Sequence, residues 1–208
     1  MRKPLGYRRP AWSETASPKR ARVSGIGAGI GRSAVISACG RYRYRLEREL
    51  RSDGPVAAWV MVNPSRADAK IDDQTIRKCL GFARRLAIGR LVIVNAFAYR
   101  AADIRELRRA DDPVGPDNDR HIEAALREAD IHIAAWGPLA KLPPHLRGRW
   151  REVLTLAARA GRRLQCLGVA KDGQPLHPLR LSYRRRLIPF DAGGTADDLR
   201  ATACGSRR

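Results

Sequence analysis

The sequence predicts an α/β fold of three layers, in which a mainly parallel central sheet carries helices on both faces. Short apolar runs typical of buried strands alternate with amphipathic segments of helical period, which is the order expected of such a fold. A second observation is the alternation of tyrosines and arginines in RYRYRLER (41–48), which indicates a half-buried strand. It adds an antiparallel strand pair on the N-terminal side of the sheet.

Composition divides the 208 residues into a basic arm at 1–33, a single α/β domain at 34–190 and a tail at 191–208. The arm is rich in Arg, Pro, Ser and Gly and has no hydrophobic period, so we expect it to be disordered. The small residues of the tail predict flexibility. The domain by itself carries 30 Lys/Arg against 17 acidic residues, so the basic excess is not confined to the arm.

The expected elements of the domain follow one another without an internal repeat. A Ser-Asp-Gly-Pro turn at 52–55 leads from the first strand to the apolar run VAAWVMV (56–62), and we expect these two strands to pair antiparallel. Asp73 is expected to cap a helix that ends near Gly89. The later expected elements are a strand at 91–94, a short helix at 104–109, a helix opened by Pro116, a strand at 131–136, a helix ending at Gly161 and a strand at 164–169.

The net charge of +20 favours a polyanionic partner, either DNA, RNA or a nucleotide. The alternative is that arginine simply fills solvated faces. The four cysteines are scattered without a CxxC pair, so neither a zinc site nor a disulfide framework is expected. No apolar run is long enough for a membrane helix and no secretory signal is visible, so we expect a cytoplasmic protein. No cofactor is expected, and the oligomeric state is left open.

Polar residues follow each expected core strand. In open parallel sheets the ligand site lies beyond the carboxyl ends of the strands, so these residues are expected to converge on one cleft. Amide side chains suit the edge of a nucleobase, aromatic rings its face, and Arg or Lys a phosphate. The candidates are Asn63, Asp72, Asp73 and His177 for catalysis, Asn95, Tyr99 and Trp136 for base binding, and Arg77, Arg100 and Lys171 for phosphate.

Each candidate also has a structural interpretation. Asn63-Pro64 is a common turn, and Asn95 could cap a loop. Asp72 and Asp73 could be catalytic or metal-binding carboxylates, or could serve helix capping and the helix dipole. His177 could be a hydrogen-bonded structural histidine, and Trp136 could be a core residue.

Several motifs in order resemble the bacterial and phage family called domain of unknown function 1643. They are CGRYRYRLER, MVNPSRADAKIDDQTIRKC, VNAFAYRAAD, DPVGPDND, AAWG and KDGQPLHPL, and they span about 34–190. This resemblance implies a shared fold and says nothing of activity.

The order of the strand-end motifs also resembles the uracil-DNA glycosylase superfamily. The resemblance places Asn63-Pro64 at a water-positioning motif, Asn95 within VIVNAFAYR at the pyrimidine-recognising asparagine, Trp136-Gly137 at a third strand end, and His177-Pro178 at a late His-Pro-Ser motif. The first motif lacks an aspartate found in the most active branch, and Leu179 replaces the serine. The fold implied is uracil-DNA-glycosylase-like.

The resulting expectation is an enzyme that hydrolyses or processes a nucleobase, with a base stacked on an aromatic ring and bonded to Asn95. Asn63, with one of the aspartates, would position water, and His177 would stabilise charge on the departing base. The alternative is a non-catalytic module that binds nucleic acid or a nucleotide. A third hypothesis is a small-molecule hydrolase in which Asp72 and Asp73 hold a divalent metal.

Overall fold

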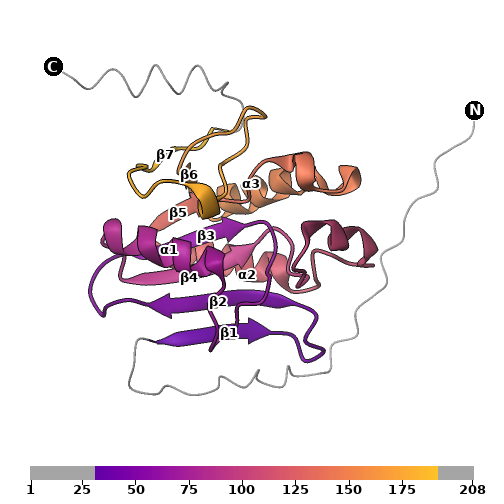
Figure 1. The fold of residues 1–208 in the computed structure, drawn as a ribbon, viewed down its shortest axis with the longest axis horizontal. Helices are drawn as coiled ribbons and strands as arrows, with labels where there is room; N and C mark the ends of the chain where they lie inside the picture. The colour runs from indigo at the N-terminus through magenta and orange to yellow at the C-terminus, as the bar shows by residue number, and fades with distance from the viewer. Residues whose placement is uncertain (1–30, 192–208) are drawn as a thin grey trace, which may run out of the picture.

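The computed structural model describes residues 31–191, and within this range the chain forms one seven-stranded sheet. The strands lie in the order β1-β2-β4-β3-β5-β6-β7 (Figure 1). The central strands β4, β3, β5 and β6 are parallel, while β1, β2 and β7 run antiparallel to their neighbours. The bounds are β1 (Arg32–Ile36), β2 (Arg43–Glu49), β3 (Val56–Met61), β4 (Arg90–Asn95), β5 (Ile131–Ala134), β6 (Gln165–Cys166) and β7 (Ile188–Pro189).

Helices connect the parallel strands. The helix α1 (Gln74–Arg85) links β3 to β4, α2 (Asn118–Glu128) precedes β5, and α3 (Arg149–Arg159) precedes β6. Short 3-10 helices occupy the longer connections: η1 (Ile104–Arg109), η2 (Leu139–Lys141), η3 (Pro144–Leu146) and η4 (Pro178–Arg180). This arrangement confirms the mixed α/β class with a sheet that is parallel in its middle.

The two faces of the sheet have separate cores, because successive side chains of a strand point to opposite faces. On one face Trp59 of β3 packs with Phe82 of α1. On the other, Val60 belongs to a cluster with Ile122 of α2 and Val153 of α3. The layers are therefore α1, the sheet, and the pair α2 and α3 (Figure 1).

The helix α1 begins where the sequence predicts. The side chain of Asp73 caps it by accepting a hydrogen bond from the backbone N–H of Ile76 at 2.9 Å. Ile76, Cys79 and Phe82 are buried on one face of the helix, which fixes that face against the sheet. The capping carboxylate thus lies at the end of α1 that follows the carboxyl end of β3.

The expected antiparallel pairing of 42–46 with 56–62 is wrong. β2 pairs with β1 and with β4, and β3 lies between β4 and β5 with both neighbours parallel to it. The crossover through α1 returns the chain to the side of β3 that faces β2, and β4 therefore separates the two strands. The antiparallel N-terminal pair is β1 with β2.

The strand β1 begins at Arg32, two residues before the predicted domain boundary at 34. Residues 1–30 and 192–208 lie outside the described residues, and the predictions of a basic arm and a flexible tail stay predictions. None of the helices within 31–191 combines the length and the apolar character needed to cross a bilayer.

Candidate functional site

Four predicted site residues follow parallel strands at the same edge of the sheet. Asn95 is the last residue of β4, Asn63 comes two residues after β3, and Trp136 two residues after β5. His177 lies against the end of β5, because a Cβ built on Gly137 would be 3.0 Å from the His177 Cβ. The backbone of these residues therefore meets at the carboxyl edge, although their side chains do not all share one face.

Asn95 is the buried centre of this edge. Ile93 belongs to the cluster under α1, so strand alternation directs the Asn95 side chain to the same face. The residue is 0% exposed, and neither its Oδ1 nor its Nδ2 has a hydrogen-bond partner among residues 31–191. Its backbone is held firmly, since Asn118 Nδ2 donates to the carbonyl oxygens of Asn95 and Ala96 at 2.9 and 3.1 Å. Asn95 thus presents an amide whose hydrogen bonds are unmade.

Arg43 enters the same region from β2. The pairing of β1 with β2 steps from Val35 opposite Arg45 to Ile36 opposite Arg43, so Tyr44 is an extra residue in a bulge. Arg43 is 2% exposed; its Nη1 donates to the carbonyl oxygen of Ala67 at 2.8 Å, while its Nε has no partner in the described chain. Burial lowers its pKa to about 10, and Asp73 acts in the opposite direction. Arg43 still carries a positive charge at neutral pH.

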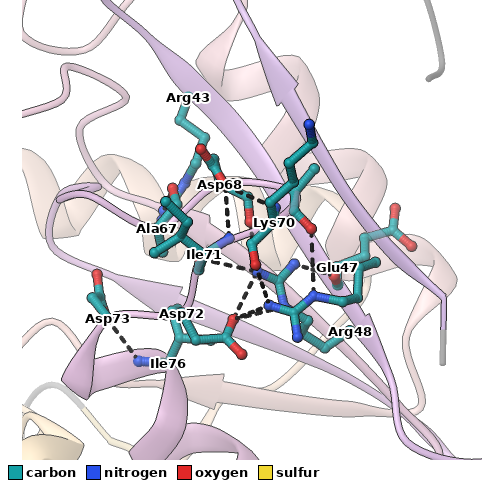
Figure 2. A network of polar contacts seen from close by, with 12 residues as sticks. Arg43, Glu47, Arg48, Ala67, Asp68, Lys70, Ile71, Asp72, Asp73 and Ile76 are labelled. Atoms are coloured by element: carbon teal, nitrogen blue, oxygen red, sulfur yellow. Dashed lines mark hydrogen bonds and ion pairs between the residues drawn. The ribbon is translucent and has the colours of Figure 1, made fainter. Parts of the chain in front are cut away.

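A loop from Asn63 to Asp73 covers this region and is tied to β2 by arginines (Figure 2). Arg48 donates to the Asp72 carboxylate at 2.8 Å and to the carbonyl oxygens of Asp68 and Ile71. Arg32 contacts the same Asp72 carboxylate at 2.9 Å. Asp72 is therefore committed to an ion-pair network that anchors the loop. This arrangement favours the structural interpretation of Asp72.

Asp73 lies at the start of α1, in the connection that follows the carboxyl end of β3. One oxygen caps α1, and no bond is made by the other within the described residues. Its charge acts on His177, Arg43 and Cys79, three side chains from three different elements. Asp68 differs, because its Oδ1 accepts from the backbone N–H groups of Lys70 and Ile71 and closes the loop on itself. Asp73 is thus the candidate that combines an unbonded oxygen with proximity to the histidine.

His177 is a neutral imidazole at physiological pH. Burial lowers its pKa to about 4; the charge of Asp73 raises it, and that of Lys141 lowers it further. The backbone N–H of Leu179 donates to Nδ1 at 3.4 Å, so we infer that the proton of the neutral ring is on Nε2. A neutral Nε2–H is a hydrogen-bond donor without a net charge.

Asn63 contributes an acceptor. Its Nδ2 donates to the carbonyl oxygens of Pro64 and Ala101 at 3.1 and 2.9 Å, which fixes the amide plane. Its Oδ1 accepts no bond from residues 31–191 and the residue is half-buried. The amide oxygen is therefore available to a water molecule or a ligand.

The two aromatic candidates are held by other contacts. Trp136 is 4% exposed, packs edge to face on Phe190 in the core under α2 and α3, and donates from Nε1 to Gln174. The burial of its ring in this core favours the core interpretation of Trp136 over the stacking role. Tyr99 lies edge to face with Tyr42, the residue that precedes β2.

The three predicted phosphate ligands lie on three different segments, and the charge of Arg100 acts on the buried Arg43. Arg100 donates to the carbonyl oxygen of Gly40, on the turn between β1 and β2. Arg77 is exposed on α1, and Lys171 is exposed in the turn after β6. Among residues 31–191 no group of three or more His, Cys, Asp or Glu is arranged to hold a metal ion. Because Asp72 is bound by two arginines, the Asp72–Asp73 metal hypothesis has no structural support.

Arg43 is the site residue that sequence reasoning missed. In RYRYRLER the simple alternation places Arg43 on the face opposite to Leu46 and Arg48, and the bulge at Tyr44 turns Arg43 to their face instead, where it bonds to the same loop as Arg48. The sequence carries no signal for this bulge, because it depends on the register of β1 against β2, which only the fold determines.

Residues 43–179 match the family model described as protein of unknown function (DUF1643). Comparisons with curated proteins and with solved structures gave no match. The family match spans the site from Arg43 through Asn95 to His177. On this match, the chain belongs to the DUF1643 family.

Proposed function

We propose that the chain binds a nucleobase at the carboxyl edge of its parallel strands and hydrolyses the bond between base and sugar. The observation that carries the proposal is the Asn95 amide, fully buried with both polar atoms unbonded in the described chain. Such an amide costs the fold about 1–3 kcal/mol. A pyrimidine edge, with adjacent carbonyl and ring N–H groups, would satisfy both atoms at once.

The neighbouring groups supply the chemistry. Water held by the Asn63 oxygen attacks the C1′ carbon of the sugar, and the bond between C1′ and the base nitrogen breaks. The base leaves with the bonding electrons, and the Nε2–H of His177 donates to the carbonyl oxygen on which the negative charge develops. The proton released by water goes to the unbonded oxygen of Asp73.

A neutral histidine suits this role. A donor that carries no charge of its own can stabilise the developing anion without being deprotonated first, and burial strengthens the interaction. The lowered pKa of His177, about 4, keeps the ring neutral at neutral pH. The activity should therefore not depend on protonating this residue.

The site is closed in this structure, since Asn95 and Arg43 are both buried. Ala67 is 0% exposed and belongs to the cluster under α1, and its carbonyl oxygen accepts from Arg43. Entry of a base therefore requires displacement of the loop segment around Ala67. Arg43, released from Ala67, would then face the ligand with its positive charge.

A second candidate function is base recognition without chemistry. It is favoured by the bonds that the three carboxylates already make. Asp72 is ion-paired, Asp68 accepts from the backbone of its own loop, and Asp73 caps α1. If capping is the whole role of Asp73, no general base is left at this edge. The chain would then bind a base through Asn95 and release it unchanged.

The test separates these functions by substituting Asp73 in two ways. Asn caps a helix about as well as Asp, so Asp73→Asn keeps the α1 cap and removes the proton acceptor, whereas Asp73→Ala loses the cap at a cost of about 1 kcal/mol. DNA that contains uracil, modified pyrimidines or normal bases is incubated with each protein and scored for abasic sites. We expect Asp73→Asn to fold normally and to lose turnover by about 10²-fold.

Two further substitutions assign the remaining roles. His177→Ala should lower turnover by about 10²-fold with binding retained, because the charge appears only in the transition state. Asn95→Asp replaces the NH₂ donor with an acceptor and should change base preference by about 1–3 kcal/mol. Base binding without abasic product from any substrate, equal in wild type and Asp73→Asn, would establish the recognition function instead. Absence of both binding and product would refute the proposal.

A further inference from the structure

Arg43 is buried at the carboxyl edge without an acidic partner in the described chain. It is 2% exposed, and no carboxylate among residues 31–191 forms an ion pair with it. The hydrogen bond of its side chain there runs from Nη1 to the carbonyl oxygen of Ala67. A buried charge without a counter-ion destabilises a fold. The reaction proposed above does not use this charge.

The unbonded donors of Arg43 lie on a single edge of its guanidinium. Nε is enclosed without a partner, and Nη2 makes no bond to the described residues. The N–H groups of Nε and Nη2 form a fork that can bind both oxygens of a carboxylate at once, whereas the bonded Nη1 is on the other side of the group. The free edge of Arg43 therefore suits an anion that presents two oxygens.

Arg43 and Asn95 enter the same end of the sheet from neighbouring strands. β2 is antiparallel to β4, so Arg43 at the start of β2 lies near the end of β4, where Asn95 is. Both side chains are on the face under α1, because Arg43 bonds to Ala67 of the cluster there and Asn95 follows Ile93 by strand alternation. Adjacent strands are about 4.8 Å apart. A ring whose edge is on Asn95 would bring its own substituent toward Arg43.

The charges around Arg43 cancel and leave its own charge over. Burial is the main cause of its lowered pKa; among the charged neighbours, Asp73 and Asp68 raise the pKa, while Arg100 and Arg48 lower it. These four neighbours sum formally to zero. Arg100 also has an enclosed Nε without a partner in the described chain. An anion on Arg43 would neutralise the remaining charge and reduce its repulsion from Arg100.

We propose that the site takes a pyrimidine with an ionised carboxylate substituent, its carboxylate on the free fork of Arg43 and its ring edge on the Asn95 amide. This class of base rests on the function proposed above, because the same amide binds the ring. A phosphate presents similar oxygens, but in a nucleotide the sugar separates the phosphate from the edge that Asn95 would bind. A substituent of the ring itself therefore fits two side chains on neighbouring strands better.

The experiment is isothermal titration of the full-length protein at neutral pH with uracil, 5-carboxyuracil and 6-carboxyuracil, and with the two matching carboxamides as uncharged isosteres. A carboxyl with an ordinary pKa of about 4 is ionised under these conditions. We expect the wild type to bind at least one carboxylate about 10- to 100-fold more tightly than its carboxamide, as a bidentate charge-assisted contact should. Equal affinities within both pairs would overturn the inference.

Substitutions of Arg43 test which side chain binds the carboxylate. Arg43→Met removes the fork and the charge, so the preference for carboxylate over carboxamide should disappear; the fold should tolerate it, because a buried unpaired charge is removed. Arg43→Lys keeps the charge without the fork and should keep only part of the preference. Arg100→Met is the matched control, since Arg100 is half-buried and its Nη1 is bonded to Gly40. A preference that survives in Arg43→Met, or is lost equally in Arg100→Met, would contradict the assignment.

The outcomes separate this inference from the function on which it rests. Uracil binding without preference for a carboxylate would leave base binding in place and overturn only the charged substituent. No binding of any of the five bases would overturn the inference, while the abasic-site assay decides the function separately. Uridine and its 5′-monophosphate complete the comparison. A preference for the monophosphate that Arg43→Met abolishes would place a phosphate on Arg43 and refute the carboxylate.

Discussion

Replacing Asn95 with leucine should make the protein more stable while removing base binding. Leucine has the same branched arrangement of four side-chain heavy atoms, and the amide it replaces is 0% exposed with no partner for either polar atom in the described chain. The fold should therefore regain the desolvation penalty of the buried amide, about 1–3 kcal/mol. For a domain of this size each kcal/mol raises the melting temperature by about 2–4 °C. Urea denaturation of the unliganded protein measures the gain directly.

Asn118 is the matched control, because it is also 0% exposed but donates two hydrogen bonds to the backbone around Asn95. Asn118→Leu should destabilise the protein by about 1–3 kcal/mol, since the Asn95 carbonyl oxygen loses this donor, while the Ala96 carbonyl oxygen keeps only the bond from Arg149. Opposite signs for the two variants are the signature of an amide kept for a ligand. If Asn95→Leu is destabilising by as much as Asn118→Leu, the amide has a structural role and the reasoning is refuted.

Three other substitutions test the surroundings of the site. Arg48→Met should lower the free energy of unfolding, measured by urea denaturation, by about 3–5 kcal/mol, because it removes the buried partner of Asp72 and two bonds to loop carbonyl oxygens. A decrease below about 1 kcal/mol would show that other contacts anchor the loop. The pKa of His177 is about 4 in the folded protein and the ordinary 6.5 in the unfolded chain, so unfolding takes up a proton between pH 4 and 6.5. The free energy of unfolding should therefore fall as the pH drops from 6.5 to 4, by up to about 3 kcal/mol. The same pH series on His177→Gln should lack that part of the fall, and identical profiles would contradict the burial argument. Gly137→Ala should destabilise the protein by about 1 kcal/mol, because Gly137 has φ +85°. It should also reduce turnover, because the new Cβ would lie 3.0 Å from the Cβ of His177. Unchanged kinetics would show that His177 does not act at the site.

The class of the fold could be predicted because its core strands carry apolar runs that need cover on both faces. The run VAAWVMV is such a strand, and β3 is indeed buried in the middle of the sheet. Strand pairing could not be predicted, because the pattern of a strand does not identify its neighbour. A short turn at 52–55 favoured a hairpin, and the crossover through α1 placed β4 between β2 and β3 instead.

The site was predictable where it depends on chain position and not where it depends on side-chain direction. The rule for parallel sheets places Asn63, Asn95 and His177 at one edge, and their backbone lies there. Trp136 follows the same rule along the chain, yet alternation turns its ring to the opposite face. Asp72 and Asp73 are adjacent in sequence, and only the contacts with Arg48 and Ile76 separate an ion-pair partner from a helix cap.

The arginines of the described chain fall into two groups, those that form ion pairs and those that do not. Much of the arginine is internally balanced, as in the buried Arg149, which pairs with both Asp119 and Glu152. The four exposed arginines at 180 and 184–186 instead make no ion pair within residues 31–191, and they begin three residues after His177. If arginine only filled solvated faces, nothing would favour an unbalanced group directly beyond the proposed catalytic histidine. A strand whose base enters at the carboxyl edge would pass its phosphates along this segment, so the position of the charge agrees with the proposed ligand better than its amount does.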